Sequence, residues 1–495
     1  MALLTNNRAL ILFSGLLLVV VGVVAISAPV KWVVLWTDAL IFALIAIILG
    51  SGWLVRNKPY LLAPWLRVLK RKLAAAALVV LLSYVVIGLL DSVHFREALP
   101  PQEGSSEVHY SPQTLSVLDK LLTPIRIQEE KSYSAPFAIH LFSKESSQRE
   151  DGSTVREYPR LQYGGAHLED IHQRPADITH TVLMASSYSL LAWLLLSALI
   201  IWTLAQRHGL SYQQQFEQLV GGEMELPWRT LLLTLLAVML FAFIAMMLGV
   251  KYHIFGTDKV GQDVLYQTLK SIRTGLVIGT LTTLVMLPFA VVLGVAAGYF
   301  RGWIDDAIQY IYTTLNSIPG VLLIAAAVLI MQAYIAGNPE LFETMEERAD
   351  ARLFFLCLIL GITSWTGLCR LLRGEALKLR ELDYVQAAHA FGVPQHKILS
   401  SHIFPNVLHI VLITLVLDFS GLVLAEAVLS YVGIGVDPTM HSWGNMINGA
   451  RLEMAREPMV WWSLMAAFIF MFILVLAANL FADAVRDAFD PRAQR

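Results

Sequence analysis

The chain has 495 residues, of which 56% are hydrophobic and only 15% are charged, and its mean hydropathy is positive. A soluble protein of this size carries more charge, so the composition predicts a polytopic membrane protein. The net charge of -2, without a basic patch interleaved with aromatic residues, argues against nucleic-acid binding. The two cysteines, Cys357 and Cys369, fall in one apolar region and provide neither a disulfide framework nor a cysteine metal cluster.

Ten apolar runs are long enough to span a bilayer, whose hydrocarbon core of about 30 Å takes about 20 helical residues. The sequence therefore predicts about ten transmembrane helices. The first run could be a signal peptide, because Ala25-Ile26-Ser27 resembles a cleavage site, but its long apolar core favours a retained span. The runs lie near residues 10–28, 32–54, 73–92, 181–203, 229–250, 276–298, 309–335, 353–372, 406–430 and 459–482.

The even number of spans places both termini on one side of the membrane. Short loops on that side carry twice as many Lys and Arg residues as those on the other, so the positive-inside rule predicts cytoplasmic N and C termini. The long loop of residues 94–180 then lies outside and has enough apolar segments for a small ordered ectodomain. We expect it to have a structural role or to contact an extracytoplasmic partner.

Residues 255–265 follow the fifth span and contain two glycines separated by four residues. This spacing occurs in phosphate-binding loops, but Gln262 and Asp263 stand where such a loop requires Lys and then Ser or Thr. Because an aspartate would repel phosphate, we exclude a nucleotide site here. Farther along, we expect Arg301 and Asp305 to form an ion pair near the cytoplasmic surface.

Residues 381–405 form a polar, amphipathic segment between two apolar runs. A helical run through Phe391 meets Gly392 and Pro394, which predicts a helix, a turn and a second helix. Small alanine side chains allow close approach, and Tyr384 and Phe391 offer large apolar anchors, as in a short helix seated in the groove of a partner protein. The alternative is an alanine-rich, solvated helix between two spans.

This segment resembles the cytoplasmic coupling loop of ABC importer permeases, whose pattern is Glu-Ala-Ala, three residues, Gly and, farther on, Ile-x-Leu-Pro. The chain departs from this pattern at Gln386, His402 and Phe404 and keeps its other fixed positions. The resemblance implies that the segment binds an ATPase subunit through a coupling helix. The residues expected to make this contact are Asp383, Tyr384, Gln386, Ala387, Ala388, Phe391, Gly392, Pro394 and Pro405.

Several segments resemble, in the same order, the second or C-type permease subunit of the dipeptide, oligopeptide and nickel family. Residues 255–265 resemble its signature GTDxxGRDV. Further matches lie at 297–305, 317–320, 426–436, 442–446 and 486–491. Together they cover about residues 226–495 and leave the first 225 unmatched. The residues assigned to the periplasmic family signature are Gly256, Thr257, Asp258, Gly261, Asp263, Trp443 and Gly444.

The resemblance implies an all-α polytopic membrane protein whose residues 226–495 form a six-span ABC permease domain with a coupling loop at 373–405. Residues 1–225 would be a four-span extension that contains the periplasmic ectodomain 94–180. The chain would lie in the bacterial inner membrane and import peptides or similar small solutes. Its partners would be a second homologous permease subunit, two cytoplasmic ABC ATPases and a periplasmic solute-binding protein. It would bind no metal or cofactor and catalyse no reaction, since the ATPases would use the ATP and Mg.

Asp418 and Glu426 are candidates for the translocation pathway because a charge within a span costs about 2.5–3.5 kcal/mol unless it faces a cavity or a partner. They are eight residues apart, which is about 80° around a helix, so both could face one pathway. The alternative is that Glu426 hydrogen-bonds the loop at 442–444 and that Asp418 pairs with the second permease.

Two other functional classes remain open. An ion-coupled secondary transporter would carry its own coupling-ion acids and show inverted repeats, and the scarcity of charges within the spans argues against it. A sensor or assembly subunit would use the ectodomain and retain the permease half as a scaffold. Uptake without an ATPase would indicate the first class, and a transporter that works without its ectodomain would argue against the second.

Overall fold

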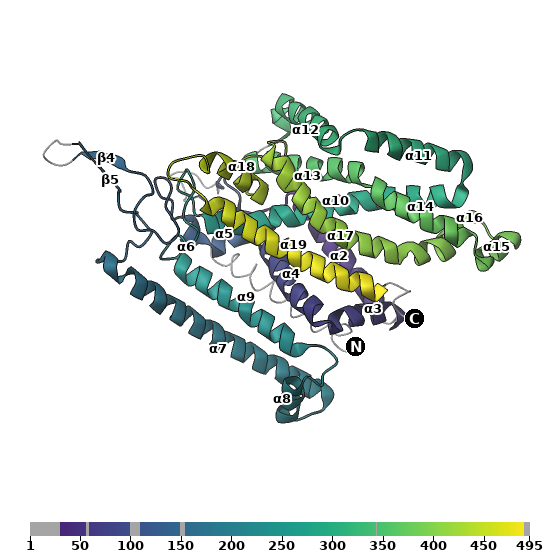
Figure 1. The fold of residues 1–495 in the computed structure, drawn as a ribbon, viewed down its shortest axis with the longest axis horizontal. Helices are drawn as coiled ribbons and strands as arrows, with labels where there is room; N and C mark the ends of the chain where they lie inside the picture. The colour runs from purple at the N-terminus through teal and green to yellow at the C-terminus, as the bar shows by residue number, and fades with distance from the viewer. Residues whose placement is uncertain (1–29, 56–58, 100–108, 149–153, 343, 490–495) are drawn as a thin grey trace.

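The computed structural model describes residues 30–55, 59–99, 109–148, 154–342 and 344–489. Within these ranges, nine helical segments are long and apolar enough to cross a membrane. They correspond to nine of the ten expected spans, and the remaining one, near residues 10–28, lies outside the described residues. The helices lie side by side in one bundle (Figure 1), so the prediction of an all-α membrane protein is confirmed.

The N-terminal half contributes four of these spans and two shorter helices at one end of the bundle. The shorter helix α8 begins with a capping box made by Ser211 and Gln214 and ends at Gly222, which has a φ of +76°. The helices of this half are α2 (Trp36–Val55), α3 (Pro59–Lys70), α4 (Lys72–Asp91), α7 (Arg174–His208), α8 (Tyr212–Gly221) and α9 (Trp228–Gly249).

The C-terminal half is built around α10, the longest helix among the described residues. The expected span at 309–335 is not one helix. Ile318 is extended, with φ -90° and ψ 131°, because the ring of Pro319 disfavours the helical conformation in the residue before it. The helices of this half are α10 (Val264–Phe300), α11 (Gly302–Ser317), α12 (Gly320–Gly337), α13 (Met345–Ser364), α14 (Thr366–Arg380), α15 (Asp383–Ala390), α16 (Gln395–Ile398), a π-helical turn (Leu399–Ile403), α17 (Phe404–Tyr431), α18 (Trp443–Glu453) and α19 (Trp462–Phe489).

The expected ectodomain is ordered where the structure describes it, but it recruits a strand from outside residues 94–180. Strand β1 (Val30–Val33), which precedes α2, pairs antiparallel with β2 (His94–Glu97), and β2 pairs with β3 (Leu115–Ser116). Two short helices, α5 (Val117–Leu121) and α6 (Thr123–Arg126), follow, and β4 (Glu145–Gln148) and β5 (Thr154–Glu157) form a hairpin. The 3-10 turns are Ile171–Gln173 and Pro339–Leu341.

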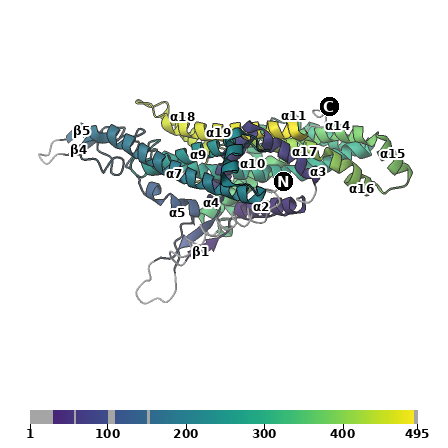
Figure 2. The same ribbon diagram turned by 90° about the horizontal axis from the view of Figure 1, so that it is seen from below.

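The described residues of the 94–180 region, for which we keep the name ectodomain, mark one end of the molecule. The β4–β5 hairpin lies at the opposite end of the bundle from α15 and α16 (Figure 1). In the view of Figure 2, the helices form a flat layer and β1 lies on one side of it. The two ends of the bundle therefore carry different segments: the ectodomain at one and the expected coupling segment at the other.

The tightest helix contact joins α10 to α14 through glycines four residues apart. A Cβ atom at Gly294 would lie 2.7 Å from the carbonyl oxygen of Cys369, and one at Gly298 would lie 2.5 Å from that of Arg373. These distances are too short for a real side chain, so the two backbones touch directly, as in the G-x-x-x-G contacts of membrane helices.

The variant Gly298→Ala should therefore destabilise the membrane domain by about 1–3 kcal/mol, because the added methyl must push α14 away. Thermal unfolding of the purified protein in detergent would measure this. Gly374→Ala, in the facing helix α14, is the matched control because a Cβ atom there would have no other atom within 4 Å. Equal melting temperatures for both variants would contradict the close contact.

Candidate functional site

The expected coupling segment has the predicted helix, turn and helix. Helix α15 starts at Asp383, whose carboxylate favours the positive end of the helix dipole. It ends at Gly392, which has a φ of +72°, and the N–H of Val393 donates to the carbonyl of Ala388 over 3.1 Å. This is the six-to-one hydrogen bond of a Schellman motif. Pro394 then leads directly into α16.

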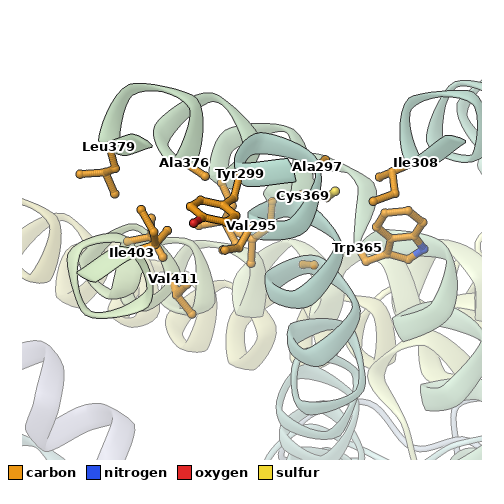
Figure 3. Packing of buried hydrophobic residues seen from close by; sticks show 14 of the residues in the cluster. Val295, Ala297, Tyr299, Ile308, Trp365, Cys369, Ala376, Leu379, Ile403 and Val411 are labelled. Atoms are coloured by element: carbon orange, nitrogen blue, oxygen red, sulfur yellow. The ribbon is translucent and has the colours of Figure 1, made fainter. Parts of the chain in front are cut away.

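The buried side of the segment is fixed to the rest of the bundle. Val385, Ile398 and Ile403 enter a hydrophobic cluster formed with residues of α10, α11, α14 and α17. Figure 3 shows Leu379, Tyr299 and Ile403 gathered in one part of this cluster. Because buried apolar contacts of this kind resist deformation, the segment should move together with α14 and α17.

Ion pairs reinforce the same attachment, although with different partners from those expected. Arg301 does not pair with Asp305. Its Nη2 donates to Glu381 Oε1 over 2.5 Å, and Asp305 accepts bonds of 2.6 and 2.8 Å from Nε and Nη2 of Arg373. The hydrogen bonds from Arg373 hold the pKa of Asp305 below its ordinary value. Arg380 also donates to the carbonyl oxygen of Tyr299 over 3.0 Å.

The outer side of the segment projects from the bundle. Phe391 is 87% exposed and Tyr384 is 45% exposed, and no atom would lie within 4 Å of a Cβ at Gly392. Ala388, by contrast, packs inward against the hydrophobic cluster. The expected contact residues that are exposed are Asp383, Tyr384, Gln386, Ala387, Phe391, Gly392, Pro394 and Pro405.

The two pathway candidates have different surroundings. Glu426 is only 2% exposed and accepts a hydrogen bond of 2.7 Å from Ser430 Oγ. A Cβ at Gly444 would lie 2.8 Å from its Oε1, so Glu426 sits directly behind the 442–444 loop. Asp418 is partly buried and has no hydrogen-bond or ion-pair partner within the described part of the chain. The surroundings of Glu426 fit the alternative in which it supports the loop.

The signature glycines allow the ectodomain to approach the permease half. Gly256 has a φ of +66°, and a Cβ there would lie 2.2 Å from the carbonyl oxygen of Ser134. At Gly261, where φ is +84°, the corresponding distance to the carbonyl oxygen of Glu130 is 1.7 Å. Only glycine fits such positions. Between them, Thr257 Oγ1 accepts a bond of 2.7 Å from the N–H of Ser134.

The other signature residues stabilise the same region from within. Asp258 Oδ1 accepts bonds of 3.0 and 2.9 Å from the N–H groups of residues 260 and 262 and so closes the turn. Asp263 caps α10 by accepting from the N–H of Tyr266 over 3.1 Å. The buried Trp443 donates from Nε1 to the carbonyl of Thr268 over 3.2 Å. Gly444 lies against Ser430 and Glu426. The signature therefore builds structure at this end of the bundle.

A buried triad of charges, which the sequence patterns do not reveal, joins the ectodomain to the signature. His253 Nδ1 lies 2.7 Å from Asp263 Oδ2, and its Nε2 lies 3.4 Å from Glu130 Oε1. Burial alone would lower the pKa of His253, but the hydrogen bonds to Asp263 and Glu130 raise it to about 9. His253 is therefore a cation at neutral pH and neutralises carboxylates from both halves of the chain.

Glu130 is held from its other side by the ectodomain backbone. Its carboxylate accepts bonds of 2.8, 2.8 and 3.0 Å from the N–H groups of Gln162, Tyr163 and Gly164. Burial raises the pKa of Glu130, but the hydrogen bonds from His253 and from these three N–H groups together lower it to about 2. A single glutamate thus links the 160s loop to the signature segment.

Comparisons with known proteins find similarity in the second half of the chain. Residues 290–495 match the family described as binding-protein-dependent transport system inner membrane component. The oligopeptide transport system permease protein OppC of Mycobacterium tuberculosis is 32% identical over 242 residues, which cover 49% of this chain and 77% of that protein. OppC of Haemophilus influenzae is 30% identical over a region that covers 49% of this chain and 71% of that protein. The glutathione transport system permease protein GsiD of Pectobacterium atrosepticum is 32% identical over a region that covers 48% of this chain and 73% of that protein.

The variant His253→Gln should lower the free energy of unfolding by about 3–5 kcal/mol at neutral pH, because it leaves two buried carboxylates without their cation. The raised pKa of His253 also fixes a pH dependence. The stabilisation that protonated His253 gives the folded state is complete below the pKa of histidine in the unfolded chain, about 6.5. It is lost as the pH rises through the folded-state pKa of about 9.

Melting temperatures of both proteins between pH 6 and pH 10, measured in detergent, would check this. The difference between the original protein and His253→Gln should shrink as the pH rises. His172→Gln, a change at an exposed histidine of the same region, should leave the profile unaltered. A difference that stays constant across the whole range would contradict the buried cation.

Proposed function

The chain belongs to the family of binding-protein-dependent transport system inner membrane components, and we propose that it is the permease subunit of an ATP-driven importer of peptides or similar small solutes. The observation that carries the proposal is the segment at 381–405. It projects an exposed Phe391 and Tyr384 from a base that is fixed to α10, α14 and α17. Exposed aromatic anchors on a short helix suit the groove of a partner protein.

In this proposal the segment transmits ATPase movement to the spans. Closure of two ATP-loaded ATPase subunits would displace α15, and the hydrophobic cluster beneath it would carry α14 and α17 along as a rigid body. The resulting tilt would open the pathway alternately to the two sides. Because such coupling is reciprocal, a loaded binding protein on the outside should raise the affinity for ATP on the inside.

The partners follow from the same arrangement. A second homologous permease subunit would complete the pathway, two cytoplasmic ABC ATPases would supply ATP and Mg chemistry, and a periplasmic solute-binding protein would deliver the solute. We propose that the end of the bundle carrying α15 is cytoplasmic, together with both termini, and that the opposite end, with the β4–β5 hairpin, is periplasmic (Figure 1). The membrane would be the bacterial inner membrane.

We further propose that residues 1–225 are a structural extension of the permease domain. Helix α10 carries Lys270 and Arg273, and residues of this extension supply their nearest counter-charges, beside Asp350 of the second half. Lys270 Nζ lies 2.6 Å from Asp91, and Arg273 Nη2 lies 2.6 Å from Asp38. This dependence supports a structural role over a detachable sensor domain.

Purification of the protein from its native membrane, followed by identification of the proteins that come with it, would test the proposal. We expect two ABC ATPases and a second permease. Phe391→Ala should weaken ATPase binding by about 2–4 kcal/mol, as removal of a central aromatic anchor does. Phe216→Ala, on the exposed surface of α8, is the matched control. A chain that purifies alone and transports under an ion gradient would contradict the importer.

The variant Gly392→Arg provides an independent check of the same contact. No atom lies within 4 Å of a Cβ at this position, so arginine fits the isolated chain and costs only about 1–2 kcal/mol for its left-handed φ. We expect it to abolish ATPase association while the melting temperature changes little. Gly392→Asn, which tolerates the left-handed region, should retain the ATPases. Normal co-purification with the arginine variant would refute the coupling assignment.

A further inference from the structure

Two neighbouring cavities lie between the N-terminal helices α3 and α4 and the pair α8 and α9. The first has a volume of about 650 Å³, and seven of its fifteen lining residues are leucines, among them Leu69, Leu78 and Leu231. The second, of about 530 Å³, shares Trp228 and three adjoining residues with the first. Together they form one cleft, which we call the α3–α9 cleft, with an apolar part and a polar part.

The polar part carries an excess of positive charge. Lys70, Lys72 and Arg229 line it, all three are exposed, and none forms an ion pair with another described residue. Arg207 lines the apolar part, as do Glu223 and Glu225. Only two carboxylates, Glu223 and Glu225, line the cleft, so four cations outnumber two anions. The cleft therefore favours an anionic group beside its apolar part.

The flanking helices have features that are typical of a membrane surface. Helix α3 is amphipathic: Leu62 and Val68 are buried, and Lys70 is exposed, as in helices that lie in the interface. Trp228 begins the apolar helix α9, and tryptophan is enriched at the boundary between hydrocarbon and water. In a membrane of this orientation, the apolar part of the cleft would adjoin lipid chains and the cations would adjoin the headgroups.

The cleft is preformed because α8 is fixed in place. Gln215 is fully buried, and its Oε1 lies 2.9 Å from Nδ1 of His208 at the end of α7. Leu219 packs between α7 and α9 in the same hydrophobic cluster as Leu232. A binding site that needs no rearrangement loses less free energy on ordering its ligand.

From these observations we infer that the α3–α9 cleft binds one anionic phospholipid, with an acyl chain in the apolar part and the phosphate beside Lys70, Lys72 and Arg229. A free phosphate ion could use the cations but would leave the apolar part unfilled, so the phospholipid matches both parts. The inference does not depend on which solute the protein transports or on which ATPases bind it.

Titration of the detergent-solubilised full chain with phosphatidylglycerol or phosphatidylcholine, followed by native mass spectrometry and thermal unfolding, would test the inference. Phosphatidylglycerol should bind as one retained molecule and raise the melting temperature more than phosphatidylcholine does. Replacing Lys70, Lys72 and Arg229 by glutamine should lower its affinity about fivefold for each charge removed. Leu69→Trp should also lower it, by filling the apolar part.

Arg486→Gln is the matched control because Arg486 is an exposed cation of α19 that lines neither cavity. It should keep full affinity for phosphatidylglycerol. Equal loss in Arg486→Gln, equal binding of phosphatidylcholine, or displacement of the lipid by inorganic phosphate would each overturn the inference. The melting temperature of each variant in phosphatidylcholine shows whether it folds, so loss of folding is separated from loss of binding.

Discussion

The structure depends on the neutralisation of two cations near the start of α10. Lys270 Nζ lies 2.6 Å from Asp91 and 3.1 Å from Asp119, and Arg273 bonds Asp38 through both Nε and Nη2, at 3.1 and 2.6 Å. Removing one partner of a buried pair leaves an uncompensated charge and costs about 3–5 kcal/mol. All three carboxylates belong to the first half of the chain, so that half neutralises charges on the central helix of the second half.

Helix α10 connects the two ends of the molecule. At one end Asp263 caps it and joins the triad with His253, and at the other end Gly298 and Tyr299 contribute to the base of the coupling segment. With 37 residues it is about 55 Å long at a rise of about 1.5 Å per residue. One continuous helix, with Pro288 inside it, therefore connects the ectodomain contacts with the base of the proposed ATPase contacts.

The sequence predicts best those features that depend on local patterns. Hydropathy alone detects each described span, although it merges part of α11 with α12, and Gly392 followed by Pro394 identifies the turn after α15, because these residues act on their own backbone. The exposure of Phe391 also agrees with its expected role as an anchor. The signature glycines Gly256 and Gly261, by contrast, are identified only by resemblance, and the structure shows that the backbone there comes close to Ser134 and Glu130.

Local sequence patterns do not predict features that depend on the tertiary arrangement of the chain. Arg301 has an acidic residue four positions away, yet it bonds Glu381 because α14 and its following turn pack across α10. Strand β1 has four residues, too few for a clear alternation, and its partner is more than sixty residues away. His253 carries no motif of its own, and its role appears only when Glu130 reaches it from the ectodomain. For Glu426 the sequence leaves two alternatives open, and its position directly behind Gly444 fits the one in which it supports the 442–444 loop.

The order of the charged residues along the chain has a consequence for biogenesis. A ribosome completes Asp38, Asp91 and Asp119 well before it reaches Lys270 and Arg273. Domains generally fold from the N-terminus during synthesis, so the carboxylates are in place when α10 is inserted. The two cations of α10 are therefore synthesised after three of their counter-ions. Only Asp350, which lies 3.4 Å from Arg273, is synthesised later. The first half of the chain thus supplies these carboxylates before the cations that they neutralise are synthesised.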